Sequence, residues 1–196
     1  MSDISDRVKI EETKLLSDNH YILNRISFAW QRSDGTWTQD NKREVYDRGN
    51  GCAILLFNRE RRSVVLVKQF RLPAYMNGYS DMLIEAAAGL LDEADPLSRI
   101  ISEAEEETGY TPRNVVKVCE AFMSPGAVTE KLSLFVGEYD PAKRSGKGGG
   151  LVDEGEDIEV LELAFDDAVA MIGDGRICDA KTIILLQYAQ LHIFSK

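Results

Sequence analysis

Three of the four glutamates in residues 103–107 have the spacing best suited to chemistry in this sequence. Glu103, Glu106 and Glu107 are three and four residues apart, so on a helix their carboxylates lie on one face. Unit charges about 5 Å apart repel by roughly 3 kcal/mol at an effective dielectric near 20. Arg99 can reach Glu103 only from the preceding turn, and no other Lys or Arg stands at a helical offset that would relieve the repulsion.

Two interpretations of these acids follow. Most glutamate-rich helix faces simply stay solvated, and the triplet taken alone is typical of them. Alternatively, a bound cation relieves the repulsion, and all-oxygen ligands favour Mg2+ or Mn2+ over zinc.

The residues around the acids predict how a helix would hold them. Asp95 and Pro96 are suited to the N-cap and the first helical position, and Gly109 to the C-terminal end. An apolar stripe would face the core, and it consists of Leu97, Ile100, Ile101 and Ala104. Before the helix, Ala88 to Asp92 predicts a glycine turn that brings backbone carbonyls toward the same cations.

The remaining pattern predicts an α/β/α sandwich with a mixed sheet, plus a small N-terminal antiparallel β-sheet subdomain. Residues 1–48 would form the subdomain and residues 49–196 the main domain. Strands are expected at 8–16, 21–32, 37–46, 51–57, 63–70, 82–87, 115–122, 131–139 and 158–163, with closing helices at 165–172 and 179–193 and an irregular segment at 73–81.

A polar, glycine-rich stretch, residues 141–155, precedes the last strand. Such a stretch is either a plain surface loop or a mobile loop that closes over a ligand. We favour the mobile loop, because Glu154, Glu156 and Asp157 follow its glycines and would be delivered near the acidic helix.

Composition limits the partners. A formal net charge of -10 argues against nucleic acid and against anionic membranes, since both reward basic patches. The amino terminus lacks an apolar signal core, and no apolar run reaches membrane-spanning length. We therefore expect a cytoplasmic protein.

The acidic segment resembles the signature of the Nudix hydrolases. The matching positions are Gly89, Glu103, Ala104, Glu106, Glu107, Gly109 and Tyr110. Asp95 and Ser102 stand where the signature has Glu and Arg, and the spacer between them is one residue short.

Nearly the whole chain resembles the GDP-mannose pyrophosphatase branch of that superfamily. The flanking motifs that carry the resemblance are residues 16–19, 42–51, 67–71, 123–126 with 128–130, and 156–160.

The resemblance implies a set of metal ligands: the Ala88 carbonyl, Glu103, Glu106, Glu107 and Glu156. Glu107 could bridge two ions, and the attacking water is activated by metal alone or by Glu130 or Glu156. The cofactor would be Mg2+, with Mn2+ as a substitute.

Substrate recognition is implied at a wider set: His20, Tyr21, Lys42, Arg43, Glu44, Arg71, Ala88, Gly89, Leu90, Glu107, Glu130, Gly155, Glu156 and Lys181. Arg71 is the strongest of the basic candidates, because guanidinium suits phosphate oxygens and it directly precedes the segment leading to the signature.

The implied function is metal-dependent hydrolysis of GDP-mannose to GMP and mannose 1-phosphate. The alternatives are hydrolysis of ADP-ribose or another nucleoside diphosphate sugar, and a non-catalytic nucleotide-sugar sensor. Relatives dimerise by exchanging amino-terminal sheets, so we expect a homodimer in which Lys42 and Arg43 serve the partner's site, with Trp30 and Trp37 in the interface or in the core.

Overall fold

The computed structural model describes residues 3–91, 95–151, 153 and 155–195. The chain forms two compact units: Met1–Asn50 with Ser124–Glu130, and Gly51–Met123 with Lys131–Lys196. The first unit therefore takes a short segment from the middle of the chain as well as the amino terminus. The functional division expected between residues 48 and 49 stays a prediction.

The first unit contains a three-stranded antiparallel sheet in the order β1 (Val8–Asp18), β2 (Ile22–Trp30), β3 (Asn41–Asp47), preceded by the short helix η1 (Ser5–Arg7). The third strand starts later than expected. Trp37 pairs only through an isolated bridge to Gln31, and Asp40 has a left-handed φ of 55° that interrupts an extended chain.

The second unit is built on a mixed seven-stranded sheet. Its main path runs β10 (Glu159–Ala164), β5 (Ser63–Gln69), β4 (Gly51–Asn58), β9 (Lys131–Glu138), β8 (Arg113–Phe122), while β6 (Leu83–Glu85) pairs with β5 and β7 (Ala87–Leu90) with β4. β4 and β9 are parallel, and the other named pairs are antiparallel.

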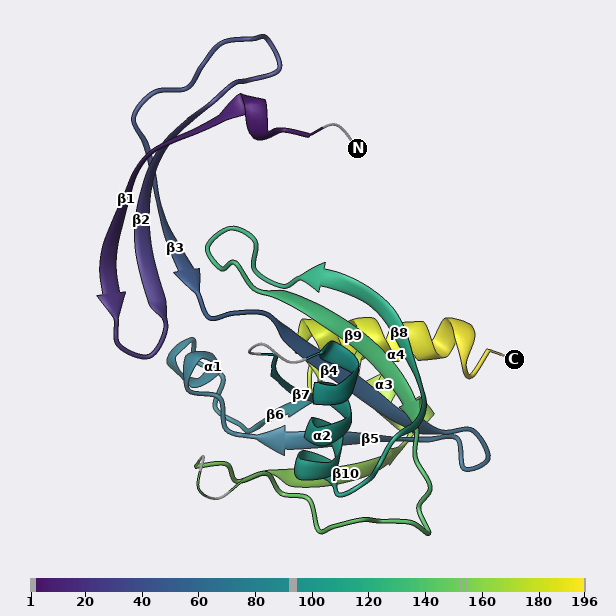
Figure 1. The fold of residues 1–196 in the computed structure, drawn as a ribbon. Coiled ribbons are helices and arrows are strands. Elements are labelled where there is room, and N and C mark those ends of the chain that lie inside the picture. The colour runs from purple at the N-terminus through teal and green to yellow at the C-terminus, as the bar shows by residue number, and fades with distance from the viewer. Residues whose placement is uncertain (1–2, 92–94, 152, 154, 196) are drawn as a thin grey trace. The chain divides into compact units, whose positions relative to one another are not determined.

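Helices cover both faces of this sheet, as Figure 1 shows. Strand β4 explains the layers, because alternate side chains point to opposite faces. Cys52, Ile54 and Leu56 pack in the same core as Ile100 and Ala104 of α2 (Pro96–Thr108). The intervening residues Ala53, Leu55 and Phe57 pack with α3 (Phe165–Gly173) and α4 (Ala180–His192). The predicted α/β/α sandwich with a mixed sheet is confirmed.

Two local predictions are wrong. The single strand expected at 82–87 is divided into β6 and β7, because the Ala86 N–H between them donates to Thr182 Oγ1 at 2.7 Å instead of to the sheet. Gly89 consequently lies within β7 and not in a turn, and Asp92 lies outside the described residues. The segment expected to be irregular contains a short helix, α1 (Leu72–Met76), whose second residue is a proline suited to a first turn.

Within the described part of the chain, no helix is long and apolar enough to cross a membrane.

Candidate active site

The acidic helix α2 begins and ends where the sequence predicts. Asp95 caps it by accepting a hydrogen bond from the Ser98 backbone N–H at 3.0 Å, and Pro96 is its first residue. Gly109 ends it with a φ of 76°, a left-handed conformation that glycine adopts without strain. These local signals fix which residues of the helix can face the sheet.

Two of the three glutamates are buried. Glu103 is 6% exposed and Glu107 only 2% exposed, on the same side as the core residues Ile100 and Ala104. Glu106 is partly exposed, with 31% of its side chain open. The solvated-face interpretation is therefore wrong for Glu103 and Glu107, because a buried carboxylate must be compensated by a partner or a proton.

Glu107 is held against β7. The Ala88 N–H donates to Glu107 Oε2 at 3.1 Å. Burial, reinforced by the negative charges of Glu103 and Glu156, raises the pKa of Glu107 to about 8, against weaker lowering by the Ala88 N–H and by Arg71. In the metal-free protein this carboxyl is mostly protonated at pH 7.

Glu103 forms an ion pair with Arg99, which is closer than the sequence alone indicated. Arg99 Nη2 lies 2.5 Å from Glu103 Oε1, its Nη1 lies 3.9 Å from Glu106 Oε2, and its Nε–H donates to the Leu90 carbonyl at 3.2 Å. The repulsion predicted for Glu103 is thus partly relieved, because Arg99 reaches it from the preceding turn. That relief does not extend to Glu107, whose pKa is raised.

Gly89 gives the Glu103 carboxylate its room. A Cβ at position 89 would lie 1.7 Å from Glu103 Oε1, so any larger residue would force the Glu103 side chain out of this position. The glycine of the signature thus acts through contact with a glutamate side chain and not through turn formation.

Glu156, about fifty residues later in the chain, interacts electrostatically with Glu107. Its Oε2 accepts a hydrogen bond from the Leu151 N–H at 2.9 Å, and its charge contributes to the raised pKa of Glu107. Glu156 and Glu107 therefore belong to one electrostatic cluster, while Glu154 lies outside the described residues. We call Glu103, Glu106, Glu107 and Glu156 the acidic cluster.

The acidic cluster suits a hard cation chemically, because its side chains offer only oxygen donors. Among the described residues, however, no three His, Cys, Asp or Glu side chains are already grouped as a metal site. The contacts explain why: Glu103 is turned to Arg99 and Glu107 to the Ala88 N–H. The assignment of Ala88, Glu103, Glu106, Glu107 and Glu156 as ligands stays a prediction.

A second set of charges lies in the same unit. Arg71 Nε lies 2.7 Å from Glu85 Oε1, Lys181 Nζ lies 2.5 Å from Glu85 Oε2, and Lys181 Nζ lies 3.0 Å from Asp179 Oδ1. Burial raises the pKa of Glu85, but the two cations outweigh it and hold that pKa below its ordinary value. We call these four residues the Glu85 cluster.

The Glu85 cluster brings together two predicted substrate-binding residues, Arg71 and Lys181, and adds two that the sequence argument missed. Arg71 also lowers the pKa of Glu107, so this cluster adjoins the acidic one. The available signal was a lone carboxylate at the end of the apolar run Leu83, Ile84, Glu85.

In the first unit, the predicted residues His20, Tyr21 and Glu130 are linked through Tyr46 and Arg48. His20 and Tyr21 have ring centroids 4.4 Å apart, Tyr21 contacts Tyr46 edge-on at 5.8 Å, and Arg48 lies 5.6 Å over Tyr21. Arg48 Nε is also 3.4 Å from Glu130 Oε1. Tyr46 and Arg48 were not predicted as site residues, although they stand in one of the flanking motifs.

Three further predicted residues, Lys42, Arg43 and Glu44, are exposed on β3. In the second unit, Leu90 is partly buried in β7 and Gly155 occupies an exposed turn with a φ of 75°. The binding roles of all these residues stay predictions.

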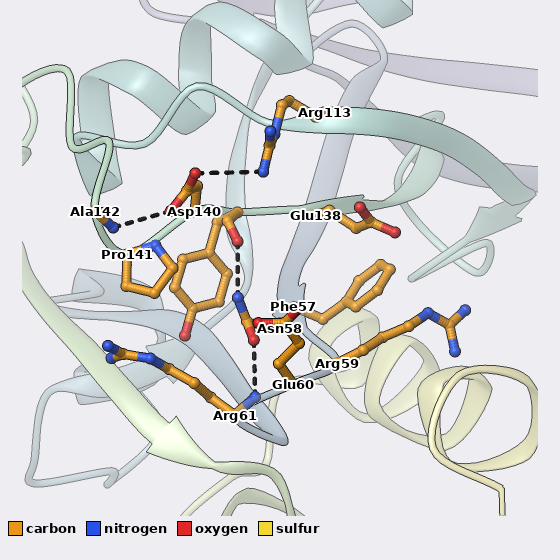
Figure 2. Close-up of a pocket in the computed structure, with 11 residues that line it drawn as sticks. Phe57, Asn58, Arg59, Glu60, Arg61, Arg113, Glu138, Asp140, Pro141 and Ala142 are labelled. Atoms are coloured by element: carbon orange, nitrogen blue, oxygen red, sulfur yellow. Dashed lines mark hydrogen bonds and ion pairs between the residues drawn. The ribbon is translucent and has the colours of Figure 1, made fainter.

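A separate hollow of about 570 Å³ lies where the β4–β5 hairpin meets the end of β9 (Figure 2). It contains none of the predicted site residues. Its arginines are engaged locally: Arg113 with Asp140 at 3.6 Å, Arg61 with Glu162 at 3.4 Å, and Arg59 with the Ile193 carbonyl at 2.7 Å. We therefore place the candidate chemistry at the two charge clusters and not in this hollow.

The fold is shared with a solved structure described as an ADP compounds hydrolase. The TM-score is 0.73 over 97% of this chain and 96% of that chain, at 14% sequence identity. At this identity the likeness shows a shared fold, in which an acidic helix packs beside a glycine-containing strand.

Sequence comparison narrows the class. Residues 7–46 match the family model "GDP-mannose pyrophosphatase NudK N-terminal domain". The chain is 53% identical over 187 residues to a GDP-mannose pyrophosphatase of Pectobacterium atrosepticum, with 95% of each chain covered. It is 50% identical over 189 residues to one of Cronobacter sakazakii, covering 96% of this chain and 97% of that one. The chain belongs to the GDP-mannose pyrophosphatase family of Nudix hydrolases.

Proposed function

We propose that this protein hydrolyses the diphosphate of GDP-mannose, giving GMP and mannose 1-phosphate, with Mg2+ as the cofactor and Mn2+ as a substitute. The observation that carries the proposal is the identity of 53% along 95% of the chain with a relative named for this activity. The partly buried, incompletely neutralised acidic cluster supports it, because a diphosphate needs cations before water can attack it.

Each cluster has a part in this proposal. Glu103, Glu106, Glu107 and Glu156 hold the divalent cations together with the Ala88 carbonyl. When bound, such a cation neutralises phosphate oxygens and lowers the pKa of attacking water. Arg71 and Lys181 bind substrate oxygens. The buried Glu85 carboxylate, which is only 2% exposed, orients both cations through its ion pairs with them.

The proton of the attacking water is taken by Glu156 or by Glu130. Glu156 is part of the acidic cluster, and Glu130 is 13% exposed in the side chain and paired with Arg48 in the other unit. Because Glu156 is also proposed as a cation ligand, the Glu130→Gln variant decides between them. If Glu130 is the base, this variant loses most of its turnover together with the acidic limb of its pH–rate profile. If Glu156 is the base, the pH–rate profile of Glu130→Gln stays normal.

A substrate panel tests the activity. Purified protein with Mg2+ is given GDP-mannose, ADP-ribose and other nucleoside diphosphate sugars, and GMP, AMP and sugar phosphates are separated by chromatography. We expect the highest kcat/KM for GDP-mannose. Equal turnover of ADP-ribose would make the enzyme a general nucleotide-sugar pyrophosphatase, and binding without cleavage would make it a sensor. Hydrolysis in 18O-labelled water identifies the phosphorus attacked.

We also propose a homodimer with exchanged N-terminal sheets. Support comes from large apolar side chains that are exposed on the three-stranded sheet, including Ile10 at 60%, Leu15 at 56% and Trp30 at 44%. Sedimentation tests the proposal, and a fully active monomer would refute it.

A further inference from the structure

The glycine-rich segment 144–151, which we call the strap, is bound to the C-terminal end of α2. The Gly149 N–H donates to the Glu107 carbonyl at 2.9 Å, and the Gly150 N–H donates to the Glu106 carbonyl at 3.2 Å. The Ser145 N–H donates to the Gly109 carbonyl at 2.8 Å. The last carbonyls of a helix have no partner within it, so the strap supplies donors that α2 lacks.

Gly148 meets the helix backbone directly and Gly150 meets the Glu156 side chain, which explains why both positions are glycine. Gly148 has a φ of 65°, and a Cβ there would lie 2.6 Å from the Glu107 carbonyl oxygen. Gly150 has a φ of 77°, and a Cβ there would lie 2.4 Å from Glu156 Oε2. Gly146 differs, because its nearest atom would be 4.0 Å away. The glycine run is thus shaped for docking on the helix and not only for flexibility.

Arg144 fastens the strap to the helix. Its Nη2 donates to the Thr108 carbonyl at 3.2 Å and to the Lys147 carbonyl at 2.6 Å, so one guanidinium joins the helix end to the strap. The guanidinium also lies 5.3 Å over the Tyr110 ring. A cation at a helix C-terminus is further favoured by the helix dipole.

The chain just before the strap is fixed as well. The Ala142 N–H donates to Asp140 Oδ1 at 3.0 Å, and Asp140 Oδ2 faces Arg113 at 3.6 Å, as Figure 2 shows.

The C-terminal end of the strap contacts Glu156 of the acidic cluster. The Leu151 N–H donates to Glu156 Oε2 at 2.9 Å, and the Ile158 N–H donates to the Gly149 carbonyl at 3.2 Å. Glu156 is thereby linked to the carbonyls of Glu106 and Glu107, whose side chains belong to the same cluster.

We propose that Arg144 is a positioning residue that, through the strap, sets Glu156 beside Glu107 for cation binding. This inference rests on the proposed function for its meaning in catalysis. Arg144 touches the helix end and the strap, so its effect on the reaction is indirect.

Two variants test the inference by different routes. Arg144→Ala removes the guanidinium, and Gly148→Ala places a methyl group against the helix carbonyls. Their controls are Lys147→Ala, which removes a neighbouring cation, and Gly146→Ala, which adds the same methyl group where there is room. The readouts are hydrogen exchange of the Gly149 and Gly150 amides, Mn2+ affinity by calorimetry, and steady-state kinetics with GDP-mannose.

In both test variants we expect amide exchange of Gly149 and Gly150 to speed up at least about tenfold, and Mn2+ affinity to fall about tenfold. We expect kcat to fall about tenfold with KM within about twofold, and both controls to stay close to the unsubstituted protein. Faster exchange with unchanged Mn2+ affinity and kcat would reduce the strap to a structural cap and overturn the inference. So would unchanged exchange in both test variants.

Exchange and Mn2+ binding are measured without substrate. A protein that fails to cleave GDP-mannose would therefore refute the proposed function, while the role of the strap in holding Glu156 is still decided by these two measurements.

Discussion

The Glu85 cluster and the acidic cluster are neighbouring sets of charged side chains that differ in net charge. The first has as many cations as carboxylates, whereas the second has an excess of carboxylates. Glu85 and Asp179 are matched by Arg71 and Lys181, and the pKa of Glu85 is lowered despite burial. Glu107 shares its surroundings with Glu103 and Glu156, and its pKa is raised to about 8.

The difference shows how this chain manages buried carboxylates. Where it supplies its own cations, the carboxylate stays ionised and forms part of the structure. Where it supplies too few, the carboxylate keeps a proton or awaits a cation from outside. The shortage of positive charge at Glu107 therefore supports the proposal that a divalent ion binds there.

The largest effect is expected from a substitution that removes a cation from the Glu85 cluster. Lys181→Met leaves Glu85 with one cation fewer in a buried position, since Glu85 is 2% and Lys181 8% exposed. We expect the free energy of unfolding to fall by about 3–5 kcal/mol, measured by urea denaturation. The matched control, Lys117→Met, breaks an exposed pair with Glu120 and should cost less than about 1 kcal/mol. Equal losses in the two variants would show that the Glu85 cluster is not a buried network.

The next effect removes the central acid of the unbalanced cluster. Glu107→Gln should lower kcat for GDP-mannose by at least about two orders of magnitude, near 3 kcal/mol of barrier stabilisation. The metal-free variant should unfold no more readily than the unsubstituted protein at pH 8, because the amide needs no counter-charge. An unchanged rate would contradict the role assigned to Glu107.

The contrast also predicts how stability depends on pH. The folded protein keeps the Glu107 proton up to about pH 8, whereas the unfolded chain releases it near the ordinary pKa of 4.5. The folded state therefore binds more protons in this window, and stability falls as pH rises through it. We expect the metal-free protein to lose roughly 3–4 kcal/mol of unfolding free energy between about pH 5 and pH 8, since each pH unit in this window is worth about 1.4 kcal/mol.

Urea denaturation across that pH range measures the loss. Glu107→Gln should flatten the profile, and saturating Mn2+ should flatten it as well, because a bound cation replaces the proton. A profile with the same slope in Glu107→Gln would assign the effect to another group.

The smallest effect moves a carboxylate without changing any charge. Gly89→Ala places a methyl group 1.7 Å from the present position of Glu103 Oε1, so the Glu103 side chain must shift. We expect kcat to fall about tenfold, near 1.4 kcal/mol, with a small change in stability. Gly173→Ala, which meets no atom within 4 Å, is the control. Full activity in Gly89→Ala would show that the observed position of Glu103 is not needed.

The fold was largely predictable from local signals. The continuous apolar run of β4 and the capping residues Asp95 and Gly109 act within a few positions, so sequence alone locates them. The break at Ala86 was not predictable, because it depends on Thr182, 96 residues later in the chain.

The candidate site divides in the same way. The spacing of Glu103, Glu106 and Glu107 and the basic character of Arg71 and Lys181 could be read from the sequence. The pairing of Lys181 with Glu85 joins residues 96 positions apart, and the contact of Arg144 with the helix end joins residues 36 positions apart. Contacts at such sequence separations leave no periodic pattern in the sequence, so Glu85 and Arg144 could not be predicted as site residues.

By itself the sequence determined most of the secondary structure, the family and which carboxylates are candidates for binding a cation, because propensity, capping and side-chain chemistry belong to the residues and their near neighbours. The tertiary structure decided which carboxylates are buried, which are neutralised by the chain's own cations, and where the glycines dock. Burial and charge balance arise only when distant segments pack together, and these two quantities distinguish a structural ion pair from a place for a metal ion.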